Sequence, residues 1–319
     1  MANEYLLQVE GLKKYFNLGK GRILKVVDDV SFAIRPGETL GLVGESGCGK
    51  TTVGRTLLKL YKPDGGKIIY RGEDITHVSA RRQRELCCKM QMIYQDPYAS
   101  LNPFMTIGEI VSEGLEINKI GANRAERTEM TYELLAKVGL QREHFNRFPH
   151  EFSGGQRQRA GIARALAVNP EFVVCDEAIS ALDVSVQAQI ITMLMDLREQ
   201  MNLTYLFIAH DLSVVRYISQ RVAVMYLGKV MEIGSAAEVY ANPVHPYTKG
   251  LLNAVPVADP DFEKSKTYHA MQGEVSSPIN CKPGCRFADR CPMATERCRQ
   301  EDPVMKSVGA DHWVACHQL

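Results

Sequence analysis

The residues best suited to chemistry begin at Gly44, in the stretch GESGCGKT. Gly44, Gly49, Lys50 and Thr51 have the spacing of a phosphate-binding loop. The apolar run TLGLV precedes the stretch, and the helical pattern VGRTLLKLY follows it. Backbone N–H groups at such a helix start can wrap a phosphate, while the lysine reaches the terminal phosphates of a nucleotide and the threonine binds Mg²⁺. The stretch therefore predicts nucleotide binding.

Three further strand-like runs end in polar residues. The run FVVCDE ends in Asp176 and Glu177, and TYLFIAHD supplies His210. After a phosphate-binding loop, such an aspartate is expected beside Mg²⁺ and the neighbouring glutamate near the attacking water. Strand ends on this face of an α/β sheet line the ligand crevice, which favours a role for the histidine. Gln95, in MIYQDP, either reaches the same crevice or is a polar residue that opens a turn.

The elements that must position these residues alternate between strand and helix along the chain. Val- and Ile-rich strands with intervening helices predict an α/β fold, a P-loop (RecA-like) core whose largely parallel sheet is covered by helices. The N-terminal part is β-rich, and the tail is rich in proline and cysteine. The expected domains are a nucleotide-binding core, an inserted helical subdomain and a small Cys-rich C-terminal extension, at residues 1–97 with 167–235, 98–166 and 236–319.

Composition places the chain among ordinary globular proteins. It has 319 residues, of which 45% are hydrophobic and 24% charged, and a formal net charge of +1. This balance gives no electrostatic reason to expect a nucleic-acid partner. The apolar runs are shorter than the ~20 residues of a membrane span, and the start lacks the pattern of a signal peptide. We therefore expect a cytoplasmic protein with reduced thiols.

The stretch FSGGQRQRAGIARAL places Ser153 and two glycines directly before a helical pattern, a second helix start that can face an anion. Together with the phosphate-binding loop, YQDP, CDEAISALD and AHD, it resembles the nucleotide-binding subunit of an ABC transporter. These motifs follow the family's order over residues 5–235. The resemblance implies a transport-coupled ATPase that uses ATP and Mg²⁺. It also implies a second ATPase subunit, because signature motifs of this family close over the ATP of the partner.

The resemblance assigns roles to individual residues. Catalysis is expected from Glu177, His210 and Lys50, with Asp183 as the D-loop aspartate. Mg²⁺ is expected at Thr51, Gln95 and Asp176, and Phe16, or alternatively Tyr15, is expected to stack on adenine. The remaining nucleotide-binding residues belong to the phosphate-binding loop and the signature motif: Gly44, Glu45, Ser46, Gly47, Cys48, Gly49, Thr52, Ser153, Gly154, Gly155 and Gln156. Phe152 and Ala178 replace the usual Leu and Pro without removing a reacting group.

Three stretches, YQDPYASLNPFMTIGEIV, ALDVSVQAQII and HPYTKGLL, are similar to the ATPases of dipeptide and oligopeptide importers. The resemblance implies two permeases, a paralogous second ATPase and an extracytoplasmic substrate-binding protein. The chain would lie peripherally on the cytoplasmic face of the inner or plasma membrane. Importers of the same group for nickel, opines or sugars are one alternative. Soluble ABC ATPases are another, although they usually carry a long coiled coil or tandem cassettes.

The tail contains Cys281, Cys285, Cys291, Cys298 and Cys316. The pairs typical of zinc ribbons and the spacings of ferredoxins are absent, yet so many thiols in a reduced compartment favour a metal or cluster. Similar tails in peptide-importer ATPases imply a [4Fe–4S] cluster on the last four cysteines, with Zn²⁺ as the alternative. His312 is either a zinc ligand or a surface histidine. We expect the metal to hold an extension that apolar burial alone cannot.

Overall fold

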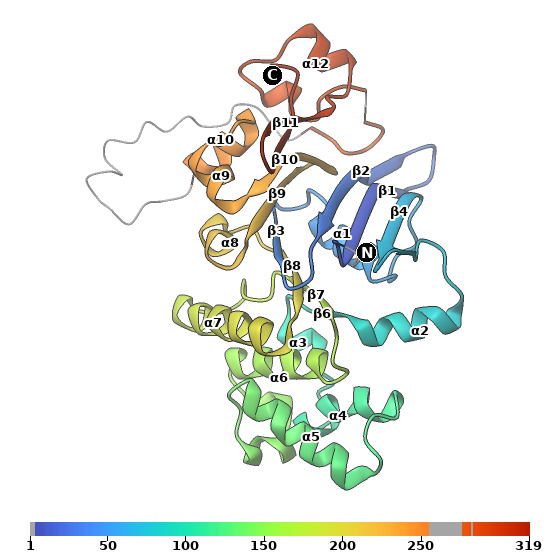
Figure 1. Ribbon diagram of the computed structural model, residues 1–319, viewed down its shortest axis with the longest axis vertical. Coiled ribbons are helices and arrows are strands. Elements are labelled where there is room, and N and C mark those ends of the chain that lie inside the picture. The colour runs from blue at the N-terminus through green and yellow to red at the C-terminus, as the bar shows by residue number, and fades with distance from the viewer. Residues whose placement is uncertain (1–3, 255–275, 282) are drawn as a thin grey trace, which may run out of the picture. The chain divides into compact units, whose positions relative to one another are not determined.

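The computed structural model describes residues 4–254, 276–281 and 283–319 (Figure 1). The chain forms two compact units, each built from separate stretches. The first contains Met1–Ile34, Thr39–Thr76 and Ala209–Leu319, and the second contains Arg35–Glu38 and His77–Ile208. Residues 255–275 of the expected C-terminal extension lie outside the described residues.

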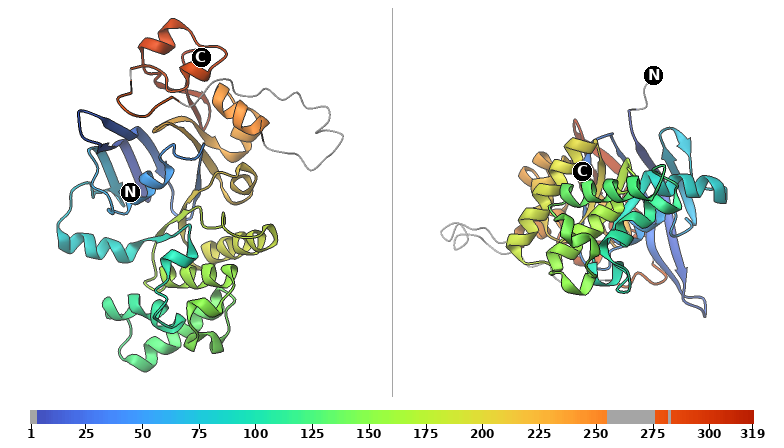
Figure 2. Two further views of the ribbon diagram at one scale, coloured as in Figure 1. Left: turned by 180° about the vertical axis from the view of Figure 1, so that it is seen from behind. Right: turned by 90° about the horizontal axis from the view of Figure 1, so that it is seen from below.

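The first unit contains an antiparallel sheet in the order β2-β1-β4-β5, whose strands are seen from two sides in Figures 1 and 2. Leu7, Val9 and Leu12 of β1 are buried between more exposed neighbours, which is the two-residue period of a strand. Leu7 pairs with Ile34 on one side and Tyr70 on the other. The strands are Leu7–Asn17 (β1), Ile23–Ile34 (β2), Gly65–Tyr70 (β4) and Glu73–Asp74 (β5).

A second set of strands in the first unit follows the order β11-β12-β10-β9-β3. β3 is parallel to β9, and the other neighbours in this set are antiparallel. Every residue of β3 is buried, as expected for a strand covered on both faces. The strands are Thr39–Val43 (β3), Arg221–Tyr226 (β9), Lys229–Ser235 (β10), Met305–Gly309 (β11) and His312–Ala315 (β12).

The described part of the first unit also contains short helices. They are Lys50–Leu57 (α1), Leu212–Ile218 (α8), Ala236–Ala241 (α9), Pro246–Asn253 (α10), the 3₁₀ helix Ala288–Arg290 (η3) and Glu296–Gln300 (α12). The tail is joined to the rest of the unit by a sheet contact, since Glu232 of β10 pairs with Val314 of β12.

The second unit contains three parallel strands in the order β8-β7-β6, with all residues of β7 and β8 buried. They are Met90–Ile93 (β6), Phe172–Asp176 (β7) and Thr204–Ile208 (β8). Its helices are Ala80–Lys89 (α2), Pro97–Ser100 (α3), Ile107–Ile117 (α4), Arg124–Lys137 (α5), the 3₁₀ helices Arg142–Asn146 (η1) and Pro149–Glu151 (η2), Gly154–Leu166 (α6) and Val184–Met201 (α7).

The helices α4, α5 and α6 pack on one another within the second unit (Figure 1). Thr106 begins α4 with a capping box, in which its side chain accepts from the backbone of Glu109 and the glutamate reaches back. In the described part of the chain, no helix combines the length and the apolar character needed to cross a membrane.

Candidate active site

The phosphate-binding loop, residues 44–51, connects β3 to α1 in the first unit. At Gly44 a side chain would begin 2.1 Å from the carbonyl oxygen of Met225, and at Gly49 only 2.3 Å from that of Val26. Both glycines have positive φ, 152° and 108°, which side-chain-bearing residues rarely adopt. The sequence therefore uses glycine here because the backbone passes too close to its neighbours for any Cβ.

Lys50 turns its ammonium group onto this loop. Its Nζ donates to the carbonyl oxygens of Gly44 at 2.8 Å and Glu45 at 3.1 Å, and the residue is only 4% exposed. Cys48 is also buried, and burial raises the pKa of its thiol. Ser46 and Gly47, by contrast, are exposed. The loop thus holds one positive charge beside exposed backbone at a helix start, an arrangement suited to a bound phosphate.

The carboxylates lie at the end of β7 in the second unit. Asp176 is the last residue of that strand and is 2% exposed. Glu177 follows with a left-handed φ of 47°, and its backbone N–H donates to the carbonyl of Ile208 at 3.0 Å. Gln95, just after β6, donates its Nε2 to Oε2 of Glu177 at 2.7 Å. The structure therefore brings Gln95 and Glu177 together, and the strained backbone at Glu177 is typical of a functional position.

His210 and Asp183 lie in turns that open helices. His210 is exposed and belongs to the first unit, one residue before Asp211, whose carboxylate caps α8 by accepting from the N–H of Ser213 at 2.8 Å. Asp183 stands at the start of α7 in the second unit and is exposed. Both residues are therefore accessible to solvent.

The signature stretch begins α6. Ser153 is exposed and caps the helix by accepting from the N–H of Gln156, whose side chain accepts in turn from the N–H of Ser153 at 3.0 Å. At Gly155 a side chain would begin 2.6 Å from a methyl group of Val186. Gly155 therefore allows the first turn of α6, which Ser153 caps, to pack closely against Val186 of α7.

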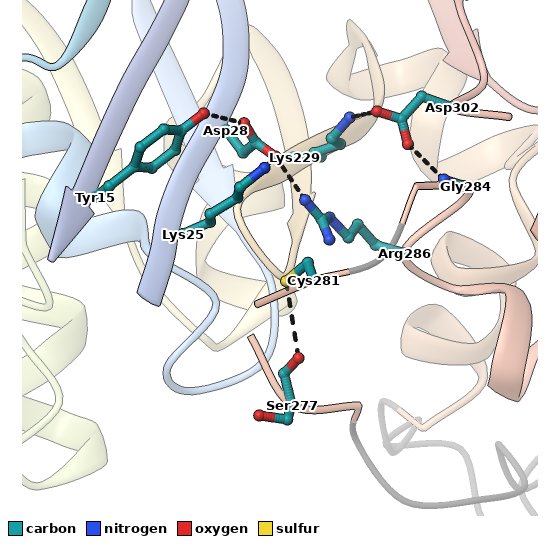
Figure 3. A network of polar contacts seen from close by, with 9 residues as sticks. All are labelled: Tyr15, Lys25, Asp28, Lys229, Ser277, Cys281, Gly284, Arg286 and Asp302. Atoms are coloured by element: carbon teal, nitrogen blue, oxygen red, sulfur yellow. Dashed lines mark hydrogen bonds and ion pairs between the residues drawn. The ribbon is translucent and has the colours of Figure 1, made fainter. Parts of the chain in front are cut away.

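The two candidates for the adenine contact, Phe16 and Tyr15, are both half-buried on β1. Phe16 packs edge-on against Tyr61 with ring centroids 5.6 Å apart. Tyr15 donates its hydroxyl to Oδ1 of Asp28 at 2.5 Å (Figure 3). The ring of Phe16 has no polar group to satisfy, so Phe16 stays the predicted stacking residue.

The predicted metal site in the tail is wrong. Among the residues that the structure describes, no three or more His, Cys, Asp or Glu side chains form a group that could hold a metal ion. Individual thiols contact other groups instead. Cys298 lies 3.3 Å from the hydroxyl of Thr295, and Cys281 contacts the carbonyl of Ser277 (Figure 3). Neither a [4Fe–4S] cluster nor Zn²⁺ is supported at the four predicted ligands, Cys285, Cys291, Cys298 and Cys316.

The physical premise behind that prediction also fails, because the tail has apolar packing of its own. Phe287 is 1% exposed and contacts the rings of Tyr226 and Tyr247, with centroids 5.4 Å away in each case. A buried aromatic cluster of this kind contributes much of the apolar area that holds a small segment in place. The extension therefore has an attachment that does not depend on a metal.

His312 is neither a zinc ligand nor a surface residue. It is 4% exposed, and its Nε2 lies 2.7 Å from Oε1 of Glu232, which is fully buried. The carboxylate of Glu232 also accepts from the backbone N–H groups of Val244 and His245, each at 2.9 Å. These donors satisfy a buried charge that would otherwise be costly.

Two residues that contact the phosphate-binding loop carry no signal in the sequence. Tyr247 accepts from the N–H of Glu45 at 2.9 Å, and Arg290 donates to both carboxylate oxygens of Glu45. They lie about 200 and 245 positions further along the chain, and local periodicity says nothing about contacts over such separations.

The residues present fit a nucleotide with Mg²⁺. The glycine backbone and Lys50 suit a phosphate, as described above. Thr51, on the first turn of α1 in the first unit, carries a hydroxyl, and Asp176, at the end of β7 in the second unit, carries a carboxylate; each is an oxygen ligand of the kind that Mg²⁺ prefers.

Comparison with known proteins identified two matching families. Residues 27–180 match the family described as ABC transporter, and residues 231–298 match the C-terminal region of oligopeptide/dipeptide transporters. The putative oligopeptide transport ATP-binding protein YkfD of Bacillus subtilis is 51% identical, over 98% of this chain and 95% of its own length. The oligopeptide transport ATP-binding protein OppF of the same organism is 56% identical, over 82% and 86%.

Solved structures of ABC proteins are also similar to this chain. The ATP-binding cassette MJ0796, in a post-hydrolysis state bound to ADP and Pi, is 28% identical with a TM-score of 0.66, over 72% of this chain and 98% of that one. The cbiO1 protein of Clostridium perfringens, part of the ABC transporter complex cbiONQ, is 25% identical with a TM-score of 0.67, over 75% and 92%. These similarities confirm the predicted α/β fold with a P-loop core.

Proposed function

The chain belongs to the ATP-binding proteins of ABC transporters, in the oligopeptide and dipeptide group, and we propose that it hydrolyses ATP to power the import of peptides. It is an ABC-type ATPase. The observation that carries the choice of cargo is the match of residues 231–298 to the C-terminal region of oligopeptide/dipeptide transporters.

ATP binding is assigned to the phosphate-binding loop. The N–H groups of the loop and the ammonium of Lys50 would hold the phosphates, with Phe16 against the adenine. Thr51, Gln95 and Asp176 would hold Mg²⁺, which when bound supplies charge neutralisation on the phosphate oxygens. In support of this assignment, Gly44 and Gly49 of the loop have no room for side chains.

Hydrolysis is assigned to Glu177 as the base that polarises the attacking water, with His210 contacting the terminal phosphate. The contact from Gln95, 2.7 Å from the carboxylate of Glu177, supports this role because it fixes the orientation of the base. By the similarity of this chain to ABC transporters, Gln95 would also couple the Mg²⁺ site to the permeases. Phosphoryl transfer needs positioning and charge neutralisation more than covalent help, and these residues offer both.

The proposed assembly contains more than this chain. The signature residues 153–156 would close over ATP bound to a second, paralogous ATPase, and the exposed serine that begins α6 supports a role at a subunit interface. Two permeases and an extracytoplasmic substrate-binding protein would complete the importer. The chain would then lie on the cytoplasmic face of the membrane as a peripheral subunit.

The test is a Glu177→Gln variant, co-expressed with its neighbouring transporter subunits and reconstituted into liposomes. We expect peptide uptake and phosphate release to fall by about 10²–10⁴-fold, while ATP binding by calorimetry stays intact. Glu199→Gln is the matched control, because the side chain of Glu199 is 74% exposed on α7. It should transport normally.

Three results would count against the proposal. Undiminished phosphate release by Glu177→Gln would remove the base from its role. Uptake of nickel, opines or sugars but not peptides would refute the cargo. Recovery of the chain from solubilised membranes with no integral membrane subunit would refute the importer.

A further inference from the structure

Glu45, the second residue of the phosphate-binding loop, is held at both its backbone and its side chain by segments from the C-terminal part of the chain. Its N–H donates to the hydroxyl of Tyr247 on α10 at 2.9 Å. Arg290, at the end of η3, donates from Nη1 to both carboxylate oxygens of Glu45, at 3.0 Å to Oε1 and 2.9 Å to Oε2. The loop is therefore tied to the tail at the residue next to Gly44.

Arg290 is held in a fixed position. Its side chain is 8% exposed, and its Nη1 also donates to the hydroxyl of Tyr226 at 3.3 Å. The rings of Tyr226 and Tyr247 pack at a tilt of 57° with centroids 4.6 Å apart, and both contact Phe287, three residues before the arginine. These aromatic contacts hold the side chain of Arg290 beside Glu45, so the arginine loses little conformational freedom when the ion pair forms.

The segment that carries Arg290 has further anchors, which Figure 3 shows. Arg286 donates to Oδ2 of Asp28 at 2.5 Å, and Lys229 pairs with Asp302 at 2.5 Å. The other oxygen of Asp302 accepts from the N–H of Gly284 at 3.0 Å. Because these contacts remain when Arg290 is replaced, its loss should act on the loop and not release the tail.

The charge of Glu45 needs a partner. Its side chain is 25% exposed, and two carbonyl oxygens of the same loop already accept from Lys50. Without Arg290, the carboxylate would leave an unpaired negative charge on the loop where phosphates must bind. A half-buried carboxylate without its cation is also free to turn toward the loop.

We propose that Arg290 is a positioning residue for ATP binding, which acts through Glu45 to keep that carboxylate away from the phosphate site and the loop in its binding conformation. The inference rests on the proposed function, since it takes the loop to bind ATP. It gives the C-terminal extension a role in nucleotide affinity.

The test measures ATP binding to the full-length chain by calorimetry, and KM and kcat by phosphate release from the assembled transporter. Arg290→Gln should raise the Kd and KM for ATP about tenfold, within the five- to 150-fold typical of coupled sites, and leave kcat within about twofold. Arg290→Lys should restore part of the affinity, because it keeps the charge but loses the planar fork.

Two further variants separate positioning from general damage to the tail. Arg297→Gln, on exposed α12 where the side chain is 65% exposed, should bind ATP as the wild type does. Glu45→Gln added to Arg290→Gln should recover affinity, since it removes the unpaired charge. A double variant as weak as Arg290→Gln, or weaker, would overturn the inference.

Other outcomes overturn it as well. If Arg290→Gln binds ATP normally while Lys50→Ala does not, the inference fails and the proposed function stands. If Arg297→Gln loses as much affinity as Arg290→Gln, the effect belongs to tail stability. If the wild-type chain itself binds no ATP, the inference and the proposed function fail together.

Discussion

Lowering the pH from 7 to 5 should destabilise the C-terminal part of the chain through one buried histidine. His245 is 2% exposed and caps α10, with its Nδ1 accepting from the N–H of Tyr247 at 3.0 Å. This contact needs an unprotonated Nδ1. The ring also packs against Phe287, with centroids 5.8 Å apart. Burial lowers the pKa of His245 from 6.5 to about 4.

The direction and size of the change in folding stability follow from the pKa of His245 in the folded chain, about 4, and in the unfolded chain, about 6.5. The unfolded chain binds the proton more readily, so the stability contributed by neutral His245 is complete above about pH 6.5 and is lost as the pH falls toward 4. With folded and unfolded values of about 4 and 6.5, the loss between pH 7 and pH 5 is about 2 kcal/mol. Such a loss corresponds to a fall in Tm on the order of 4 °C.

The assay compares the wild type with His245→Asn at pH 7, 6 and 5 by thermal unfolding. Asparagine is a good helix cap that does not titrate in this range. The variant loses the contact with Phe287 equally at every pH, so the informative quantity is the pH dependence of Tm. Between pH 7 and pH 5 we expect the Tm of the wild type to fall further than that of His245→Asn, by on the order of 4 °C.

Parallel pH profiles for the two proteins would refute the reasoning. They would mean that the folded state accommodates the charged ring, for example by turning it toward the carboxylate of Glu232, which already accepts from the backbone N–H of His245 at 2.9 Å.

Two substitutions test the loop and the signature helix. Gly49→Ala places a Cβ 2.3 Å from the carbonyl of Val26 at a φ of 108°, so calorimetry should show ATP affinity reduced by about five- to 150-fold, the equivalent of a strain of about 1–3 kcal/mol. Gly161→Ala in α6, where a Cβ meets no atom within 4 Å, is its control and should be neutral or stabilising. Ser153→Ala removes the side-chain cap on the N–H of Gln156 and should cost about 1 kcal/mol in urea unfolding, whereas Ser153→Thr should not.

Each of these has a contrary result. Wild-type affinity in Gly49→Ala would show that the carbonyl of Val26 moves away at little cost. A Ser153→Ala chain with unchanged unfolding would show that water replaces the cap on α6.

The sequence predicts the site residues well where strands and helices of regular pattern position them. Gln95 and Glu177 are 82 positions apart, yet each follows a strand of the parallel set, and parallel strands end at the same edge. The strand pattern predicts that both can lie near this edge but leaves a turn-opening role for Gln95 equally open, and the structure shows the contact with Glu177. The positions of Gly44 and Lys50 are also predicted, because the spacing of the loop is local and its strand and helix adjoin it.

The tail could not be predicted in this way. Glu232 pairs with Val314, and Arg290 contacts Glu45, although the members of each pair lie far apart in the chain. No repeat or alternation in the sequence predicts such contacts. A cluster of cysteines suggests a metal site from the sequence alone, because thiolates are strong metal ligands. An ion pair or an aromatic cluster is built from residues that are common everywhere in a chain, so the sequence does not single it out. His312 illustrates this, since its partner Glu232 lies 80 positions earlier in the chain, on β10.

The division of the first unit into separate stretches has a consequence for biosynthesis. β3, which leads into the phosphate-binding loop, pairs with β9, and Glu45 is held by Tyr247 and Arg290. A ribosome must therefore translate nearly the whole message before this loop can acquire its final contacts. The second unit, almost all of it one continuous stretch, can fold earlier as it emerges from the exit tunnel. A product released prematurely, before residue 209, would carry the loop sequence without the strand and side chains that shape it.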